Sequence, residues 1–186
     1  VPTMTWEILT HPARKDFDLS SLQDLGGGGA HRPPEHVKKL DEEFSNAKPS
    51  IGYGLTETNA IGTLNGGEDY LSRPASCGRV VPPVTELAII DQDWKILEIE
   101  GQVGEVAIKS PANMVGYWNK PDATAEVVKD GWFKTGDLGY LEDGFLFIID
   151  RVKDLVIRGG ENISCIEVES VISEHPAIFE VAVFGN

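Results

Sequence analysis

Residues 131–150 read GWFKTGDLGYLEDGFLFIID, and they hold two apolar segments separated by the turn sequence Glu142-Asp143-Gly144. Short runs rich in aromatic and β-branched residues, bounded by turn residues, form strands. By this pattern we expect short strands at 86–90, 104–109 and 132–135, and a further strand pair in which Tyr140 and residues 145–149 flank that turn. Because they follow one another closely through turns, the sequence predicts an antiparallel, β-barrel-like subdomain over residues 79–150.

Residues 1–62 alternate helix and strand signals instead. Pro2 opens a short apolar helix, and residues 22–25 read as a strand. A second helix begins at Pro33-Pro34, with three apolar residues on one face: Val37, Leu40 and Phe44. Alternating helices and strands predict a layered α/β sheet, but two strands cannot form such a sheet alone. We therefore expect the chain to be part of a larger protein.

A third unit follows Asp150. Residues 154–158 suit a strand, Gly159-Gly160 a tight loop, and residues 179–184 a further strand. Between them, Ser164 and Glu167 have the spacing of a capping box, which opens a helix through Ile172. Strand, helix and strand make half of a small α+β domain. We expect domain 1–150 to be followed by the beginning of a second domain at 151–186.

The composition excludes several classes of partner. Of 186 residues, 30 are acidic and 16 basic, giving a net charge of −14. Such a surface repels nucleic-acid phosphates and anionic lipid, so neither is an expected partner. No apolar run is long enough for a transmembrane segment, and no secretory signal precedes the folded pattern, so we expect a cytoplasmic protein. Cys77 and Cys165 stand far apart without metal-ligand spacing, which indicates small buried residues rather than a disulfide or zinc site.

Two glycine-containing segments could bind a nucleotide. Gly26–Gly29 and Ala30 follow a predicted strand, where backbone can approach a flat or phosphorylated ligand; a flexible loop is the alternative. In GYGLTET, residues 52–58, a tyrosine between glycines can lie against a base, and one carboxylate beside hydroxyls suits Mg²⁺. The same letters also fit a turn followed by a capped helix.

Asp137 has several conceivable roles. Aspartyl-phosphate enzymes place the nucleophilic aspartate before Lys-Thr-Gly, whereas Asp137 follows these residues. The order therefore argues against Asp137 as a nucleophile. A carboxylate at a strand end can instead accept hydrogen bonds from two vicinal ribose hydroxyls. Downstream, residues 150–154 are either a solvated turn or a hinge with a free Arg151. Residues 158–161, RGGE, are either a plain turn or glycines that let a thin substrate pass.

Taken in order, these segments resemble the adenylate-forming superfamily of acyl-CoA synthetases, aryl-CoA ligases, luciferases and peptide-synthetase adenylation domains. The resemblance runs through nearly the whole chain, in GGGGA, YGLTET, GEVAIKSPANMVGYWNKPDAT, GWFKTGDLG and DRVKDLVIRGGENISCIEVE. The motif GGENIS and the position of Lys153 are most similar to those of fatty acyl-CoA ligases. The resemblance implies an α/β fold with a β-barrel-like subdomain, forming part of a large N-terminal domain, and the start of a small α+β C-terminal domain.

The resemblance also implies roles for single residues. Nucleotide contacts are implied for Gly28, Gly29, Ala30, Gly52, Tyr53, Gly54, Thr56, Asp137 and Arg151. Among them, Tyr53 stacks on adenine, Thr56 lies near the α-phosphate and Asp137 binds the ribose hydroxyls. Glu57 holds Mg²⁺ and, with Thr56, belongs to the catalytic set. Lys153 is the hinge, and Gly159 and Gly160 lie beside the coenzyme A channel.

The implied reaction uses ATP, Mg²⁺ and coenzyme A. A carboxylate, expected to be a fatty acid, attacks the α-phosphorus to give acyl-AMP, and the coenzyme A thiol then displaces AMP. Another adenylate-forming ligase, of aryl-CoA or peptide-synthetase type, and a non-catalytic binding fragment are the alternatives. The family's phosphate loop and catalytic lysine do not occur in this sequence, so we expect the 186 residues alone to be inactive. Exposed strand edges predict self-association or a homo-oligomer. His31-Arg32 replaces the more frequent Pro-Leu beside the acyl pocket.

Overall fold

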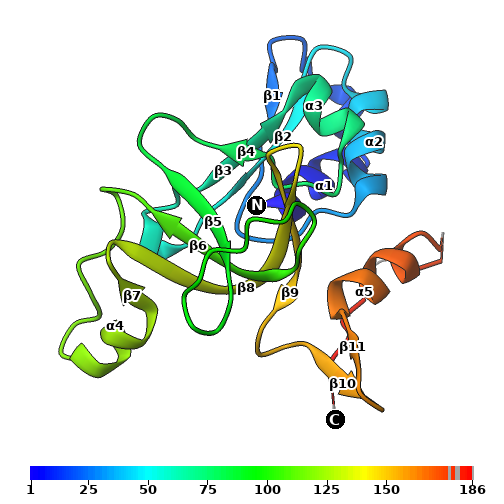
Figure 1. Ribbon diagram of the computed structural model, residues 1–186. Helices are drawn as coiled ribbons and strands as arrows, with labels where there is room; N and C mark the ends of the chain where they lie inside the picture. Colours follow the sequence, from blue (N-terminus) through cyan, green and yellow to red (C-terminus); the bar gives the residue numbers. More distant parts are fainter. Residues whose placement is uncertain (176, 179–180, 186) are drawn as a thin grey trace.

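The structure is a computed structural model that describes residues 1–175, 177–178 and 181–185 (Figure 1). Three groups of elements follow one another along the chain. Helices with a small mixed sheet come first, a curled antiparallel sheet second, and a hairpin with one helix last. No helix in the described part of the chain is long and apolar enough to cross a membrane.

The first group is an α/β layer, as expected, but its sheet is mixed. β1 and β2 run parallel, whereas β2–β3 and β3–β4 are antiparallel, in the order β1-β2-β3-β4. The layer also continues past residue 62. Its elements are α1 (Pro2–Thr10), η1 (Arg14–Asp16), β1 (Asp24–Leu25), α2 (Pro34–Glu43), β2 (Lys48–Tyr53), η2 (Thr56–Thr58), β3 (Thr63–Gly66), α3 (Gly67–Ser72) and β4 (Arg79–Val80).

Helix α2 contributes apolar contacts that hold the first group of elements together. Its start at Pro34 follows from the fixed φ of proline, which suits a first helical turn. Leu40 and, at the end of the helix, Phe44 pack against Leu25 of β1. Val37 packs on β2 and α3 in a second cluster. The predicted apolar face is therefore confirmed, and it fixes where the glycine loop leaves β1.

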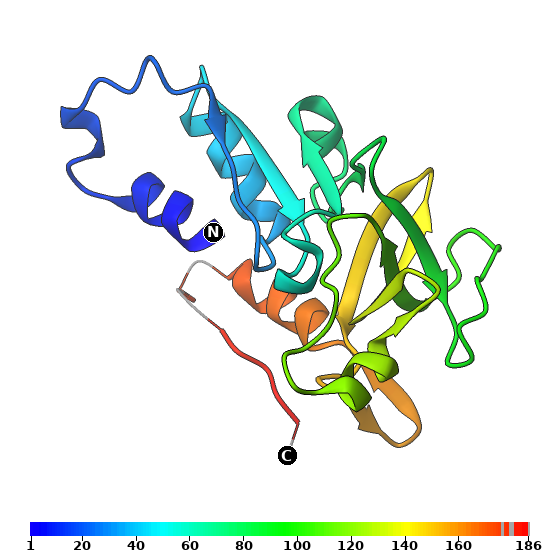
Figure 2. The same ribbon diagram turned by 90° about the vertical axis from the view of Figure 1, so that its left-hand side faces the viewer.

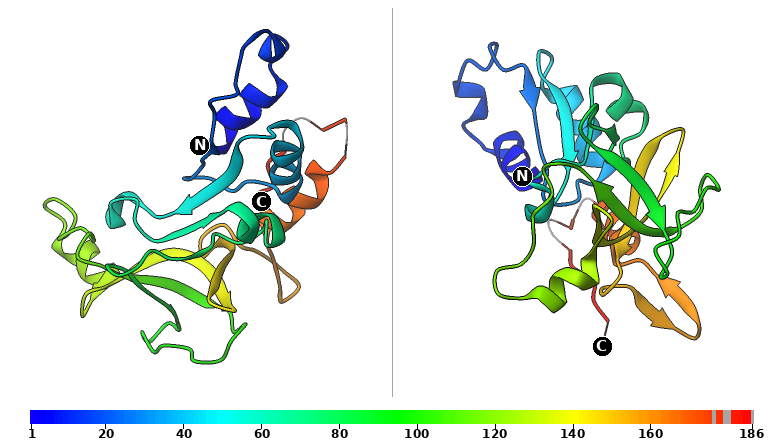
Figure 3. Two further views of the ribbon diagram at one scale, coloured as in Figure 1. Left: turned by 90° about the horizontal axis from the view of Figure 1, so that it is seen from above. Right: turned by 60° about the vertical axis from the view of Figure 1, so that its left-hand side comes forward.

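The second group is a curled sheet in which every strand pair is antiparallel (Figure 3). The strand order is β5-β6-β8-β7, with β9 on the other part of β8. Its elements are β5 (Glu86–Ile90), β6 (Gly104–Lys109), α4 (Pro121–Val127), β7 (Val128–Lys129), β8 (Trp132–Glu142) and β9 (Phe145–Arg151). The predicted strands are confirmed, but β8 extends well beyond 132–135. Neighbouring residues of one strand point to opposite, buried sides: Ile89 packs in one cluster, and Ala88 and Ile90 in another.

The two sheets are joined by backbone hydrogen bonds. Leu146 of β9 accepts from the amide of Cys77 and donates to the carbonyl oxygen of Gly78, both at 2.8 Å. The Ser76 hydroxyl also donates to Leu146 O, at 2.8 Å. A Cβ on Gly78, whose φ is +91°, would lie 2.0 Å from Leu64 O, so only glycine fits there. This junction brings the end of β2 beside β8 and β9.

The third group comprises β10 (Val156–Arg158), β11 (Glu161–Ile163) and α5 (Cys165–Ser173). The Ser164 hydroxyl accepts from the amide of Glu167 at 3.1 Å, as the capping pattern predicts. The strand expected at 179–184 is wrong for 181–184, which pair with no strand among the described residues; 179 and 180 lie outside those residues. β11, which completes a hairpin around Gly159-Gly160, was not anticipated.

Candidate functional site

A cavity of about 320 Å³ lies where the three groups meet. The glycine loop after β1, the end of β2 and the junction of β8 with β9 form its walls, and Ile166 of α5 closes another side. Figure 2 shows α5 beside the elements of the first group. Most of the predicted nucleotide-binding residues line this cavity: Gly29, Ala30, Gly52, Tyr53, Gly54, Asp137 and Arg151.

The carboxylate of Asp137 is held by two partners from different elements. The Tyr53 hydroxyl donates to Oδ2 at 2.6 Å, and Arg151 Nε donates to Oδ1 at 3.1 Å. Asp137 is 7% exposed, whereas the side chain of Arg151 is 59% exposed. Burial, and then the negative charge of Asp137, raise the pKa of the Tyr53 hydroxyl, which therefore remains a neutral donor. Each carboxylate oxygen has a second lone pair that can accept from a ligand hydroxyl.

The glycine loop is a tight backbone contact rather than a loose segment. The parallel pairing of β1 with β2 continues as a bridge between Gly28 and Gly52, and the Gly52 amide donates to Gly27 O at 2.9 Å. A Cβ on Gly28 would lie 2.9 Å from Gly52 O, which is too close for any side chain. Gly28 therefore supports the cavity wall, and the residues after it line the cavity.

Arg32 lies beneath this loop and lines the cavity, and the sequence predicted no contacts for it beyond its place beside the acyl pocket. It is 2% exposed and donates to the carbonyl oxygens of Ser50 and Leu25, at 3.1 and 3.3 Å. Its guanidinium lies 5.9 Å from the centre of the Tyr70 ring. A buried cation ties the glycine loop to both strands through their carbonyl groups. The unusual His31-Arg32 sequence was the only signal that could have indicated this contact.

Thr56 and Glu57 do not line the cavity but follow Leu55, which does. With Thr58 they form the short 3-10 helix η2, as the alternative of a turn followed by a helix predicts, although its N-cap residue Leu55 makes no side-chain cap. Glu57 Oε1 accepts from the Tyr117 hydroxyl at 2.9 Å. Among the described residues no three acidic, histidine or cysteine side chains gather as metal ligands. A single carboxylate can still contribute to a Mg²⁺ site, because Mg²⁺ takes few protein oxygens.

Lys153, Gly159 and Gly160 lie apart from the cavity. Lys153 is exposed in the turn between β9 and β10, and the two glycines form the tip of the β10–β11 hairpin, both with positive φ. The connection to α5 runs through Asp150, which is 2% exposed and accepts from the amides of Arg151 and Cys165 at 2.8 and 2.6 Å. The structure thus gathers the predicted nucleotide residues but leaves the predicted hinge and coenzyme A residues at a distance.

The opposite wall of the cavity comes from the segment Pro74–Cys77, which no sequence pattern indicated. Burial raises the pKa of the Cys77 thiol to about 12, so this thiol is protonated and unsuited to nucleophilic attack. Both cysteines are free. The segment is held at the cavity by side chains of β3 and by its pairing with β9, a contact between residues about 70 positions apart that local sequence does not encode.

Comparison with known proteins assigns the family. The model of the family described as AMP-binding enzyme matches residues 1–118. The chain belongs to this family. AMP-binding enzymes similar to it include the long-chain-fatty-acid–CoA ligase of Bacillus subtilis, which is 41% identical over 99% of this chain and 32% of its own length. The chain thus spans about a third of the length of this relative.

Solved structures of AMP-binding enzymes agree with the fold. The amide bond synthetase McbA from Marinactinospora thermotolerans matches with a TM-score of 0.90 and 34% identity, over 100% of this chain and 37% of that one. The o-succinylbenzoate CoA synthetase MenE from Bacillus subtilis, in complex with the acyl-adenylate intermediate OSB-AMP, matches with a TM-score of 0.85 and 33% identity, over 100% and 37%. The α/β layer with a curled sheet is therefore that of adenylate-forming enzymes.

Proposed function

We propose that this chain carries the nucleotide half of an ATP-dependent acyl-CoA synthetase that acts on a fatty acid. The proposal rests mainly on the carboxylate of Asp137, which accepts hydrogen bonds from both Tyr53 and Arg151 in a cavity bounded by the glycine loop. A carboxylate with both oxygens fixed in direction is well shaped to accept the two vicinal hydroxyls of a ribose. The Tyr53 ring and the backbone of Gly29 and Ala30 would then flank adenine, with Gly28, Gly52 and Gly54 allowing close approach.

In the proposed reaction the substrate carboxylate attacks the α-phosphorus of ATP, and the bond to pyrophosphate breaks. The coenzyme A thiol then attacks the acyl carbon and AMP leaves. The chain's own contribution is to hold and orient the nucleotide, with Thr56 near the α-phosphate. Glu57 would hold Mg²⁺, whose charge offsets that of the phosphates.

We further propose that Lys153 is a hinge between domain 1–150 and the unit that begins at residue 151. Lys153 lies in an exposed turn, and α5 is attached to β9 largely through Asp150 and through Ser164, whose hydroxyl donates to Ile149 O at 2.7 Å. Few bonds must break for this unit to rotate. Rotation would bring Gly159 and Gly160 toward the acyl-adenylate, where a thin pantetheine arm passes glycine backbone easily. The two free thiols suit a reducing compartment, and we propose the cytoplasm.

A second candidate is an aryl-CoA ligase, favoured by the likeness to o-succinylbenzoate CoA synthetase. The test is a pyrophosphate-release assay, with ATP and Mg²⁺, of the larger protein of which we expect this chain to be part, using fatty acids of increasing length and aromatic acids in parallel. Coenzyme A thioester is measured in the same reactions. Turnover with fatty acids supports the first candidate and turnover with aromatic acids alone the second. Release of pyrophosphate with neither class, despite nucleotide binding, would contradict both.

A further inference from the structure

The bulge that carries Asp137 is fixed from behind by side chains that do not touch the cavity. Between the pairs Ala107–Lys134 and Glu105–Leu138, three residues of β8 lie opposite Val106 alone. These residues are Thr135, Gly136 and Asp137, and the regular ladder of hydrogen bonds is interrupted there. On its other edge this part of β8 pairs with β9, so the missing bonds are those toward β6, and the direction of the Asp137 side chain depends in part on the groups that replace them.

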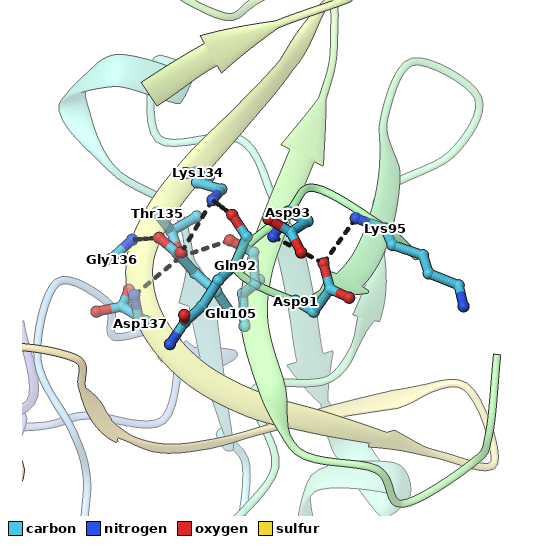
Figure 4. A network of polar contacts seen from close by, with 10 residues as sticks. Asp91, Gln92, Asp93, Lys95, Glu105, Lys134, Thr135, Gly136 and Asp137 are labelled. Carbon is cyan, nitrogen blue, oxygen red and sulfur yellow. Dashed lines mark hydrogen bonds and ion pairs between the residues drawn. The ribbon is translucent and has the colours of Figure 1, made fainter. Parts of the chain in front are cut away.

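Two side chains replace them. The Thr135 hydroxyl donates to Val106 O at 2.8 Å and accepts from the amide of Asp137 at 3.1 Å. Glu105 Oε1 accepts from the amide of Gly136 at 3.1 Å. Gly136 has a φ of +76°, in the left-handed region that favours glycine, and at this bulge its amide donates to the side chain of Glu105. Figure 4 shows these contacts around β8, with the carboxylate of Asp137 directed away from Glu105.

Glu105 is itself held in place. Its Oε2 lies 3.8 Å from Lys134 Nζ, and the side chains of Glu105 and Lys134 are 21% and 13% exposed. Lys134 Nζ also donates to Gln92 O at 3.3 Å and lies 4.4 Å from the centre of the Trp94 ring. Lys134 is thus tied to the loop that follows β5, which orients the Glu105 carboxylate toward Gly136 (Figure 4).

We propose that Glu105 is a positioning residue for nucleotide binding: through the amide of Gly136 it sets the bulge that directs Asp137 at the ribose hydroxyls. Lys134 assists by orienting Glu105. This inference rests on the proposed function, because it matters for binding only if Asp137 accepts the hydroxyls. The role requires a hydrogen-bond acceptor at position 105. Glutamine keeps a carbonyl oxygen at the same place and should therefore substitute for glutamate, whereas alanine should not.

The test compares Glu105→Ala, Glu105→Gln and the matched control Glu86→Ala, which removes an exposed glutamate from β5 of the same sheet. Calorimetry measures the Kd of each purified protein for AMP and for 2′,3′-dideoxy-AMP, which lacks both hydroxyls. The measured quantity is the Kd for 2′,3′-dideoxy-AMP divided by the Kd for AMP, which is large when the hydroxyls contribute to binding. We expect Glu105→Ala to lower this ratio roughly tenfold, the effect of losing one hydrogen bond to a charged group. Glu105→Gln and Glu86→Ala should change this ratio less than about threefold.

If Glu105 had a purely structural role, Glu105→Ala would lower the melting temperature but leave the Kd ratio of the protein that remains folded unchanged. An unchanged ratio in Glu105→Ala, where the wild-type protein discriminates between the two nucleotides, therefore overturns the inference and leaves the proposed function intact. A wild-type protein that binds neither nucleotide, or both equally, overturns the ribose role of Asp137 instead. The binding part of the inference then falls with it, and hydrogen exchange of the Asp137 amide decides only whether Glu105 sets the bulge. Faster exchange in Glu105→Ala than in Glu105→Gln supports control of the bulge by Glu105, and equal exchange refutes it.

Discussion

Replacing Asp137 by alanine separates its role in binding from its role in stability. In the folded protein the two carboxylate oxygens each accept one bond, from Tyr53 and from Arg151. If a ribose is bound, the variant loses two further bonds to a charged acceptor, each contributing about 1.5–3 kcal/mol. At the lower end, two such bonds give roughly 3 kcal/mol, on the order of a 100-fold increase in Kd.

The same change also affects the free energy of unfolding. It leaves the Tyr53 hydroxyl without its partner, which costs about 1–3 kcal/mol if water does not replace it. Arg151 is mostly exposed, so it returns to solvent at little cost. For a chain of this size we expect a fall in melting temperature of roughly 2–10 °C.

The assay is calorimetric titration with a nonhydrolysable acyl-AMP mimic, combined with thermal unfolding. The double variant Tyr53→Phe with Asp137→Ala removes both partners of the buried hydrogen bond, so stability should recover while affinity does not. Affinity within about threefold of wild type in folded Asp137→Ala would refute the ribose assignment. Loss of affinity that the double variant restores would show that the single change acts through misfolding.

Three other predictions follow from the fold. Burial, and then the positive charges of Lys39, Arg32 and His31, lower the pKa of His36 to about 4. Between about pH 6.5 and about pH 4 the unfolded chain therefore binds one more proton than the folded chain, and the free energy of unfolding should fall as the pH drops through this range. Urea titrations should show that His36→Gln flattens this dependence of the free energy of unfolding on pH, and an unchanged dependence would contradict the prediction. In the larger protein of which we expect this chain to be part, Lys153→Pro should retain acyl-AMP formation but slow thioester formation, because a rigid φ opposes rotation. Lys153→Ala should affect neither step, and single-turnover assays separate the two. Edge strands β1 and β5 should support self-association, and a strictly monomeric light-scattering mass at high protein concentration would argue against it.

The sequence by itself determined the local elements and the family. Strands at Glu86–Ile90 and Gly104–Lys109 were predicted with their observed bounds, because short apolar runs between turn residues specify strands locally. The start of α2 at Pro34 and the cap of α5 at Ser164 are likewise effects of single residues on neighbouring backbone. The order of the glycine, tyrosine and aspartate motifs was sufficient to indicate an adenylate-forming enzyme.

Only the tertiary structure decided how those motifs meet. Tyr53 and Asp137 are 84 residues apart, and they meet because β9 pairs with the segment before β4 and thereby joins the two sheets. The length of β8 was underestimated because its second half is held by pairing with β9, beyond a bulge that interrupts its pairing with β6. The strand expected at 181–184 did not form, because a strand needs a partner and an apolar run alone does not supply one. Local pattern specifies elements, whereas pairing between distant strands determines which side chains share a site.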